Sequence, residues 1–159
     1  MLLLVLFSYK IILNEYTELD TGGGGKMKQI NFIFESEKQL KEKIKVENFV
    51  EKNLLIFIFS DEPIEKIKMI IGILKKILPS ALVAGTTSAG TINDGYAIEG
   101  RSLLIFCHFD NIQPKGILLP EEDFSPKEMA VEINNKLCSE DTKILFLFKD
   151  GLENSSHIL

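Results

Sequence analysis

The chain contains few of the residues that most often carry out chemistry in proteins. Among its 159 residues there are two cysteines and two histidines. Cys107 and Cys138 lie far apart and form no Cys-x-x-Cys pair, which argues against a zinc site or a dithiol redox motif. Each cysteine is expected to behave as a small buried hydrophobic residue. Free thiols of this kind are typical of a reducing compartment. We therefore expect a cytoplasmic protein.

The chain also lacks the positive charge that nucleic acids and anionic membranes require of a partner. Its formal net charge is -5, so neither partner is expected. The apolar run at residues 1–13 is shorter than the ~20 residues that a membrane-spanning helix needs. It also has neither the basic start nor the cleavage site of a signal peptide. We therefore expect no association with a membrane.

Residues 1–26 differ in character from the rest of the chain. Acidic residues follow the apolar run, and then come four glycines, Gly22–Gly25, which have the composition of a flexible spacer. Our hypothesis is that residues 1–26 are a non-native or flexible leader and that Met27 is the true start. Mass spectrometry of the native protein would contradict this hypothesis by finding peptides from residues 1–26.

The remaining residues, 27–159, show the alternation of apolar strands and amphipathic helices that is typical of an α/β protein. Apolar runs predict buried strands, and the spacing of Ile and Leu over residues 64–78 predicts a helix between two of them. This strand, helix, strand unit should be parallel. The strands are expected at 28–35, 54–59, 81–84, 102–109 and 143–148, and further helices after Ser36 and Ser125.

The pattern therefore predicts one α/β domain with a mixed, largely parallel sheet flanked by helices. A further helix begins near Glu153, but the chain reaches Leu159 before that helix can find a partner or a cap. We interpret the domain as incomplete at its C-terminal end.

The segment from Gly85 to Gly90 is the strongest candidate for a binding site. It follows the apolar run at 81–84 and contains Thr86, Thr87 and Ser88 between its two glycines. Small side chains leave backbone N–H groups accessible, and each hydroxyl can donate one hydrogen bond and accept two. Loops that leave the carboxyl end of a parallel strand are where open α/β sheets bind ligands. The alternative is a structural turn whose hydroxyls bond to their own backbone.

The same segment does not match the known motifs of catalysis or nucleotide binding. No Gly-Lys-Ser/Thr follows it, and no serine stands between two glycines as in a Gly-x-Ser-x-Gly elbow. A hydroxyl nucleophile would also need a base, and the only histidines are His108 and His157. We therefore expect no enzyme activity, no metal site and no cofactor.

Three segments, in this order, resemble the N-terminal half of the FIST sensory domain. The first is the strand Leu54–Ser60, which precedes a helix. The second is Pro79–Ile92, which is similar to the family's Gly-x-Ser/Thr-x-Gly-Glu-Ile segment. The third is Ile144–Asn154, a strand that ends in the turn Asp150-Gly151. The resemblance covers Met27–Leu159, and it departs from the family at Thr91, where an acidic residue is common.

The resemblance implies a sensory domain of a signal-transduction protein that binds a small ligand, such as an amino acid or a related metabolite. It implies an output protein, or the C-terminal FIST half that this chain lacks, as the partner that receives the signal. The expected ligand-binding residues are Gly85, Thr86, Thr87, Ser88, Gly90, Asp150 and Gly151.

Two alternatives stay open at this stage. Some FIST proteins are similar to haem-bound nitric oxide sensors, which would give His108 a role as an iron ligand. A histidine satisfied by hydrogen bonds within a sheet is the simpler interpretation of His108. The other alternative is a protein-docking module that binds no ligand.

Overall fold

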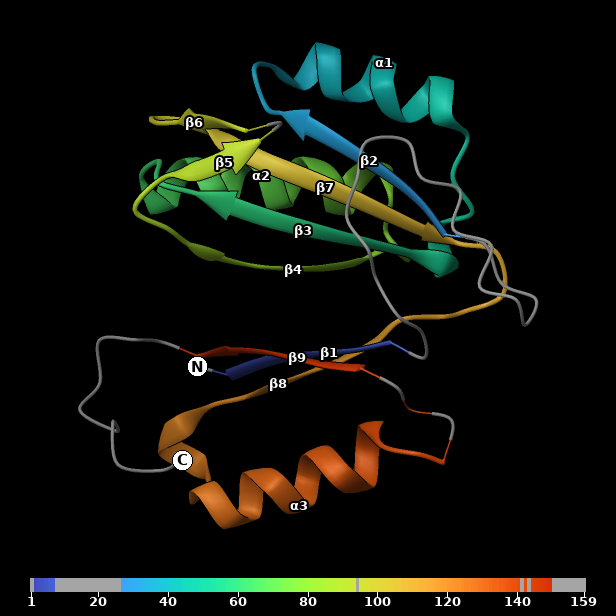
Figure 1. Ribbon diagram of the computed structural model, residues 1–159, viewed down its shortest axis with the longest axis vertical. Helices are drawn as coiled ribbons and strands as arrows, with labels where there is room; N and C mark the ends of the chain where they lie inside the picture. The colour runs from blue at the N-terminus through green and yellow to red at the C-terminus, as the bar shows by residue number, and fades with distance from the viewer. Residues whose placement is uncertain (1, 8–26, 94, 141, 143, 150–159) are drawn as a thin grey trace. The chain divides into compact units, whose positions relative to one another are not determined.

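The computed structural model describes residues 2–7, 27–93, 95–140, 142 and 144–149 (Figure 1). The chain divides into two compact units. The larger unit contains Tyr9–Pro114, and the smaller contains Met1–Ser8 and Lys115–Leu159. Residues 27–159, which were expected to form one domain, thus contribute to both units.

The larger unit is built on a four-stranded sheet with the strand order β2-β7-β3-β4. Its strands are β2 (Met27–Ile33), β3 (Leu54–Ser60), β4 (Leu82–Thr87) and β7 (Ser102–Phe109). The expected α/β class and mixed sheet are confirmed. The parallel share is smaller than expected: β3 and β4 are parallel, but β7 is antiparallel to both of its neighbours. The reason is that β7 returns between β2 and β3 and does not continue the sheet beyond β4.

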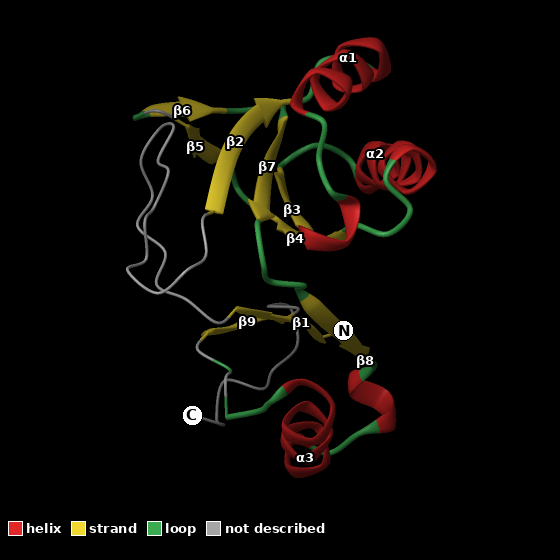
Figure 2. Cartoon of the chain, turned by 90° about the vertical axis from the view of Figure 1, so that its right-hand side faces the viewer, coloured by secondary structure: helices red, strands yellow, loops and turns green. Residues whose placement is uncertain are grey.

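Two helices cover one face of this sheet (Figure 2). The first, α1 (Glu37–Glu47), begins at Ser36, whose side chain accepts a hydrogen bond from the Gln39 amide, as its capping sequence predicts. It ends at Asn48, which has the left-handed conformation common at helix C-termini. The second helix, α2 (Ile64–Ile77), joins β3 to β4. A short 3-10 turn, Glu51–Asn53, precedes β3.

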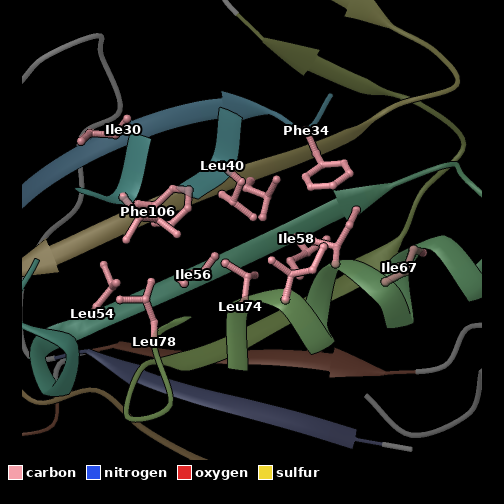
Figure 3. Packing of buried hydrophobic residues seen from close by; sticks show 14 residues of the cluster. Ile30, Phe34, Leu40, Leu54, Ile56, Ile58, Ile67, Leu74, Leu78 and Phe106 are labelled. Atoms are coloured by element: carbon pink, nitrogen blue, oxygen red, sulfur yellow. The ribbon is translucent and has the colours of Figure 1, made fainter. Parts of the chain in front are cut away.

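The core of the larger unit lies between the helices and the sheet (Figure 3). Leu40, Ile56, Leu74 and Phe106 are fully or almost fully buried there. They come from α1, β3, α2 and β7 respectively, so the core ties together elements from most of this unit. Burial of each such side chain contributes roughly 1.5–3 kcal/mol.

Strand β4 is longer than the sequence predicted. Gly85, Thr86 and Thr87 were expected to begin a loop, but they continue the strand and pair with Ile58, Phe59 and Ser60 of β3. A Cβ atom on Gly85 would lie 2.0 Å from the carbonyl oxygen of Ile58. Glycine at this position therefore permits the two backbones to pair. The sequence had indicated Gly85 only as part of a ligand-binding loop, and the structure gives it a role in strand pairing.

The smaller unit contains the three-stranded sheet β8-β1-β9 and one helix. Its elements are β1 (Leu2–Phe7), β8 (Lys115–Leu119), a 3-10 turn at Glu121–Asp123, α3 (Pro126–Leu137) and β9 (Ile144–Lys149). The helix α3 begins with a capping box between Ser125 and Glu128. Leu137 and Ile133 of α3 pack with Ile117 and Leu145 of the sheet.

Part of the segment that we interpreted as a leader is a strand in this unit. Leu2–Phe7 pair antiparallel with both β8 and β9. A continuous apolar run is typical of a strand that is buried within a sheet. The other residues of the leader, and the helix expected from Glu153, lie outside the described residues.

We predict that Gly85→Ala destabilises the protein by more than about 2 kcal/mol, because the added methyl group would overlap the Ile58 backbone. Gly72→Ala is the matched control. A Cβ on Gly72, in the middle of α2, would meet no atom within 4 Å, so this change should stabilise the protein by roughly 0.5–1 kcal/mol. Urea unfolding of both variants measures the difference. Equal stabilities would contradict the role assigned to Gly85.

Candidate functional site

The carboxyl ends of β3 and β4 meet at one edge of the sheet. Ser60, the last residue of β3, pairs with Thr87 of β4 on one side and with Ser102 of β7 on the other. The side chains of Thr86 and Thr87 are exposed there, and the Thr86 hydroxyl donates to the Thr87 carbonyl oxygen at 3.1 Å. Most of the predicted ligand segment, Gly85–Gly90, therefore lies at this edge.

Two hydroxyl groups in the segment after β4 are buried without a hydrogen-bond partner in the described part of the chain. They are Ser88 Oγ and Thr91 Oγ1. Ser88 is fixed in position because its amide donates to the Ser60 carbonyl at 2.9 Å. Thr91 is 8% exposed and begins β5 (Thr91–Asn93). A buried hydroxyl without a partner costs about 1–3 kcal/mol, so two of them within four residues indicate a place where a bound molecule or water supplies the partners.

Gly90 lies between these two hydroxyls and has a φ of +135°. This backbone conformation favours glycine and turns the chain from the edge of the main sheet into β5. The strand β5 forms a two-stranded hairpin with β6 (Tyr96–Ile98). Gly90 thus shapes the segment that holds Ser88 and Thr91.

A buried polar network lies directly beneath this edge, and sequence reasoning missed it. Ser60 and Ser102 are both fully buried, and their hydroxyl oxygens are 2.7 Å apart. Ser102 also donates to the Glu62 carboxylate at 2.5 Å, and the Glu62 amide donates to Ser60 Oγ at 3.1 Å. Lys66, one turn along α2, pairs with the other Glu62 oxygen at 2.6 Å. The network fixes the start of α2 to the ends of β3 and β7.

Asp61 follows β3 directly and binds two backbone amides of a distant turn. Its carboxylate accepts hydrogen bonds from the amides of Gly100 and Arg101, at 2.8 and 3.0 Å. The Gly100 amide is the main cause that holds the pKa of Asp61 below its ordinary value, and the Arg101 amide adds to it. Asp61 therefore anchors the turn that leads from the β5–β6 hairpin back into β7.

Five of the seven predicted ligand residues thus fall within this part of the structure: Gly85, Thr86, Thr87, Ser88 and Gly90. Their positions do not test whether they bind a ligand. Asp150 and Gly151 lie outside the described residues, as does His157. Thr91 joins the candidate site because its hydroxyl is buried and unpartnered.

His108 cannot act as a base for these hydroxyls, because it lies at the opposite end of the sheet. It pairs with Leu54, the first residue of β3, whereas Ser102 pairs with Ser60, the last. Six residues of extended strand separate the two ends by about 20 Å. The Glu62 carboxylate of the buried network is engaged by Ser102 and Lys66.

His108 is also already bonded through the nitrogen that haem iron would need. Its Nε2 accepts a hydrogen bond from the Val50 amide at 3.2 Å, and its ring lies against Phe49 with the ring centres 5.7 Å apart. These contacts match the interpretation of a satisfied sheet histidine. Among the described residues, no group of three His, Cys, Asp or Glu side chains is arranged to hold a metal ion.

Neither cysteine joins a disulfide. Cys138 is exposed, and Cys107 is buried in β7, where burial raises the pKa of its thiol to about 12. Within the described ranges, no helix is long and apolar enough to cross a membrane.

We predict that protonation of His108 destabilises the protein. Burial is the main cause that lowers the pKa of His108, with Lys28 adding to it and Asp110 opposing it. Because the folded pKa is lower than the unfolded value near 6.5, the stabilisation from neutral His108 is complete above that pH. It is lost as the pH falls from there through the folded pKa.

His108→Gln should flatten this part of the stability profile, since glutamine can still accept from the Val50 amide but does not titrate. The parent chain, measured in the same series, is the reference. Thermal unfolding between pH 5 and 8 distinguishes the two. An unchanged slope in His108→Gln would show that another group causes the loss.

A sequence model of the FIST N domain family matches residues 53–159. A search of curated proteins gave no match. The matched range starts later than the resemblance at Met27 suggested, and it contains every element from β3 to β9, including the two threonines, Ser88 and the buried network. Since the match covers well over half of the chain, the chain belongs to the FIST N domain family, whose members are sensory domains of signalling proteins.

Proposed function

We propose that this domain binds a small polar molecule, such as an amino acid or a related metabolite, at the carboxyl ends of β3 and β4. The observation that carries the proposal is the pair of buried hydroxyls without partners, Ser88 Oγ and Thr91 Oγ1. Both belong to the segment that follows β4, the place where open α/β sheets bind ligands. A bound molecule would supply the hydrogen bonds that these two groups lack.

The chemistry of the segment favours a ligand with both donors and acceptors. Hydroxyl groups can serve either function, and the exposed Thr86 and Thr87 add two more beside the buried pair. The carboxylates at this edge, Asp61 and Glu62, are already engaged by backbone amides, Ser102 and Lys66. A carboxylate on the ligand could therefore accept from the hydroxyls without meeting a free negative charge.

Occupancy of this site could be passed on through the β5–β6 hairpin. Thr91, whose hydroxyl faces the proposed ligand, is the first residue of the hairpin. The next residue, Ile92, and Tyr96 on the other strand are 75% and 76% exposed. Ile92 pairs with Ala97 and Tyr96 with Asn93, so the two side chains lie on opposite faces of the hairpin. Either one could contact a signalling partner, which would be an output protein or a C-terminal FIST half. The proposal places these events in the cytoplasm, where two free cysteines are expected.

The proposal predicts that free amino acids, tested singly at millimolar concentration, raise the melting temperature of the protein for at least one member of the set. A ligand at 100 times its dissociation constant adds about 2.7 kcal/mol of stability. Ser88→Ala and Thr91→Val should abolish this shift. Without ligand, both variants should be as stable as the parent chain or more stable, because each removes a buried hydroxyl that has no partner.

Ser80→Ala is the control, since Ser80 is exposed and lies before β4; it should keep the full response. Two results would contradict the proposal. One is the absence of any shift across the set, which would favour a docking module without a ligand. The other is a shift that Ser88→Ala and Thr91→Val both retain.

A further inference from the structure

A shallow groove lies at one edge of the main sheet, on elements that the FIST family match does not include. Its volume is about 440 Å³. It is lined by Phe32 and Ile33 at the end of β2, by Glu35 just after that strand, and by Gln39, Glu42, Lys43 and Val46 from α1. These four α1 residues have the three- and four-residue spacing of a single helix face. Both elements precede residue 53, so the groove is a feature of this chain beyond the matched domain.

The strand that borders the groove, β2, has one edge that pairs with no other strand among the described residues. In the described part of the chain β2 pairs only with β7, and Figure 1 shows it as the outer strand beside α1. The amide of Phe34 donates to the Ser102 carbonyl of the β7 side. Because hydrogen-bonded and non-bonded pairs alternate in an antiparallel ladder, the backbone groups of Gln29, Asn31 and Ile33 point outward. This outward edge can accept another strand.

The groove combines apolar contact surface with uncompensated negative charge. Val46 is 80% exposed, and Phe32 and Ile33 are half-buried. Glu42 forms no ion pair within the described residues, whereas the one lysine of the groove, Lys43, is paired with Glu47 at 3.1 Å. Glu35 lies 4.0 Å from Arg101 with both side chains more than half exposed, a pair that contributes little.

We propose that this groove binds an extended segment of a partner protein in which basic residues alternate with aliphatic ones. The segment would add a strand to the open edge of β2, with its aliphatic side chains on the face that α1 covers, against Phe32 and Val46. Its basic side chains would then lie on the opposite face, the side of Ile33 and Glu35, because neighbouring side chains of a strand point in opposite directions. Glu42 adds to the negative potential that attracts them. Strand addition of this type gains affinity from the backbone and specificity from alternate side chains. A second copy of this chain fits less well, because it would bring the same two carboxylates to the contact.

The proposal is tested with a fluorescein-labelled peptide of alternating lysine and valine, measured by fluorescence anisotropy on the full chain at low salt. We expect saturable binding that weakens as salt is added. A peptide of alternating glutamate and valine should not bind. A lysine-valine peptide with N-methyl groups on alternate amides keeps the charge and the side chains but cannot form the ladder, so it should bind at least about tenfold more weakly.

Glu42→Lys should weaken binding of the lysine-valine peptide about tenfold, and Val46→Asp should weaken it through loss of apolar contact. Glu99→Lys is the matched control for charge, because Glu99 is exposed on the turn after β6; it should bind as the parent chain does. Circular dichroism checks that each variant is folded.

Three results would overturn the proposal. The first is no binding of the lysine-valine peptide. The second is equal binding of the N-methylated peptide, which would indicate charge attraction without strand addition. The third is a dimer in sedimentation velocity that Val46→Asp dissociates, which would assign the edge to a second copy. None of these results depends on whether amino acids bind near Ser88, so the two proposals fail separately.

Discussion

The close pairing of β3 with β4 at Gly85 is the constraint on which the rest of the larger unit depends. Only glycine allows the Ile58 carbonyl to approach so near, and that approach continues the ladder to Ser60 and Thr87. The ends of both strands then stand side by side, with Ser102 of β7 on the far side of Ser60. The buried network, the position of Ser88 and the start of α2 all follow from this alignment.

Much of the fold could be predicted because local signals were strong. The apolar run at 54–59, the isoleucine spacing of α2 and the caps at Ser36 and Ser125 each fixed an element near its observed bounds. The order of the strands in the sheets could not be predicted in this way. Nothing local shows that β7 inserts between β2 and β3, or that Leu2–Phe7 fills the middle of another sheet. Those placements depend on contacts between residues far apart in the chain.

The candidate site was also predictable where it depends on local sequence, and unpredictable where it depends on distant contacts. Small hydroxylic residues between glycines identified the segment, but the propensities of Gly and Thr for turns concealed that Gly85–Thr87 extend a strand. The neighbours of Asp61 and Glu62 in the sequence do not indicate which groups their carboxylates bind. Their partners, Gly100, Arg101 and Ser102, lie about forty positions away, so only the register of β7 on β3 brings them together. That register also separates His108 from the site.

The hydrogen bonds beneath the site have a fixed direction. Ser102 has a single hydroxyl proton, and it is directed to Glu62. The proton between the two serines must then belong to Ser60, whose oxygen in turn accepts from the Glu62 amide. The circuit closes on itself, with every proton assigned and no donor left over. The two serine hydroxyls therefore have no proton left to donate to a ligand. Ser88 Oγ and Thr91 Oγ1 are the buried hydroxyls of this region that still can.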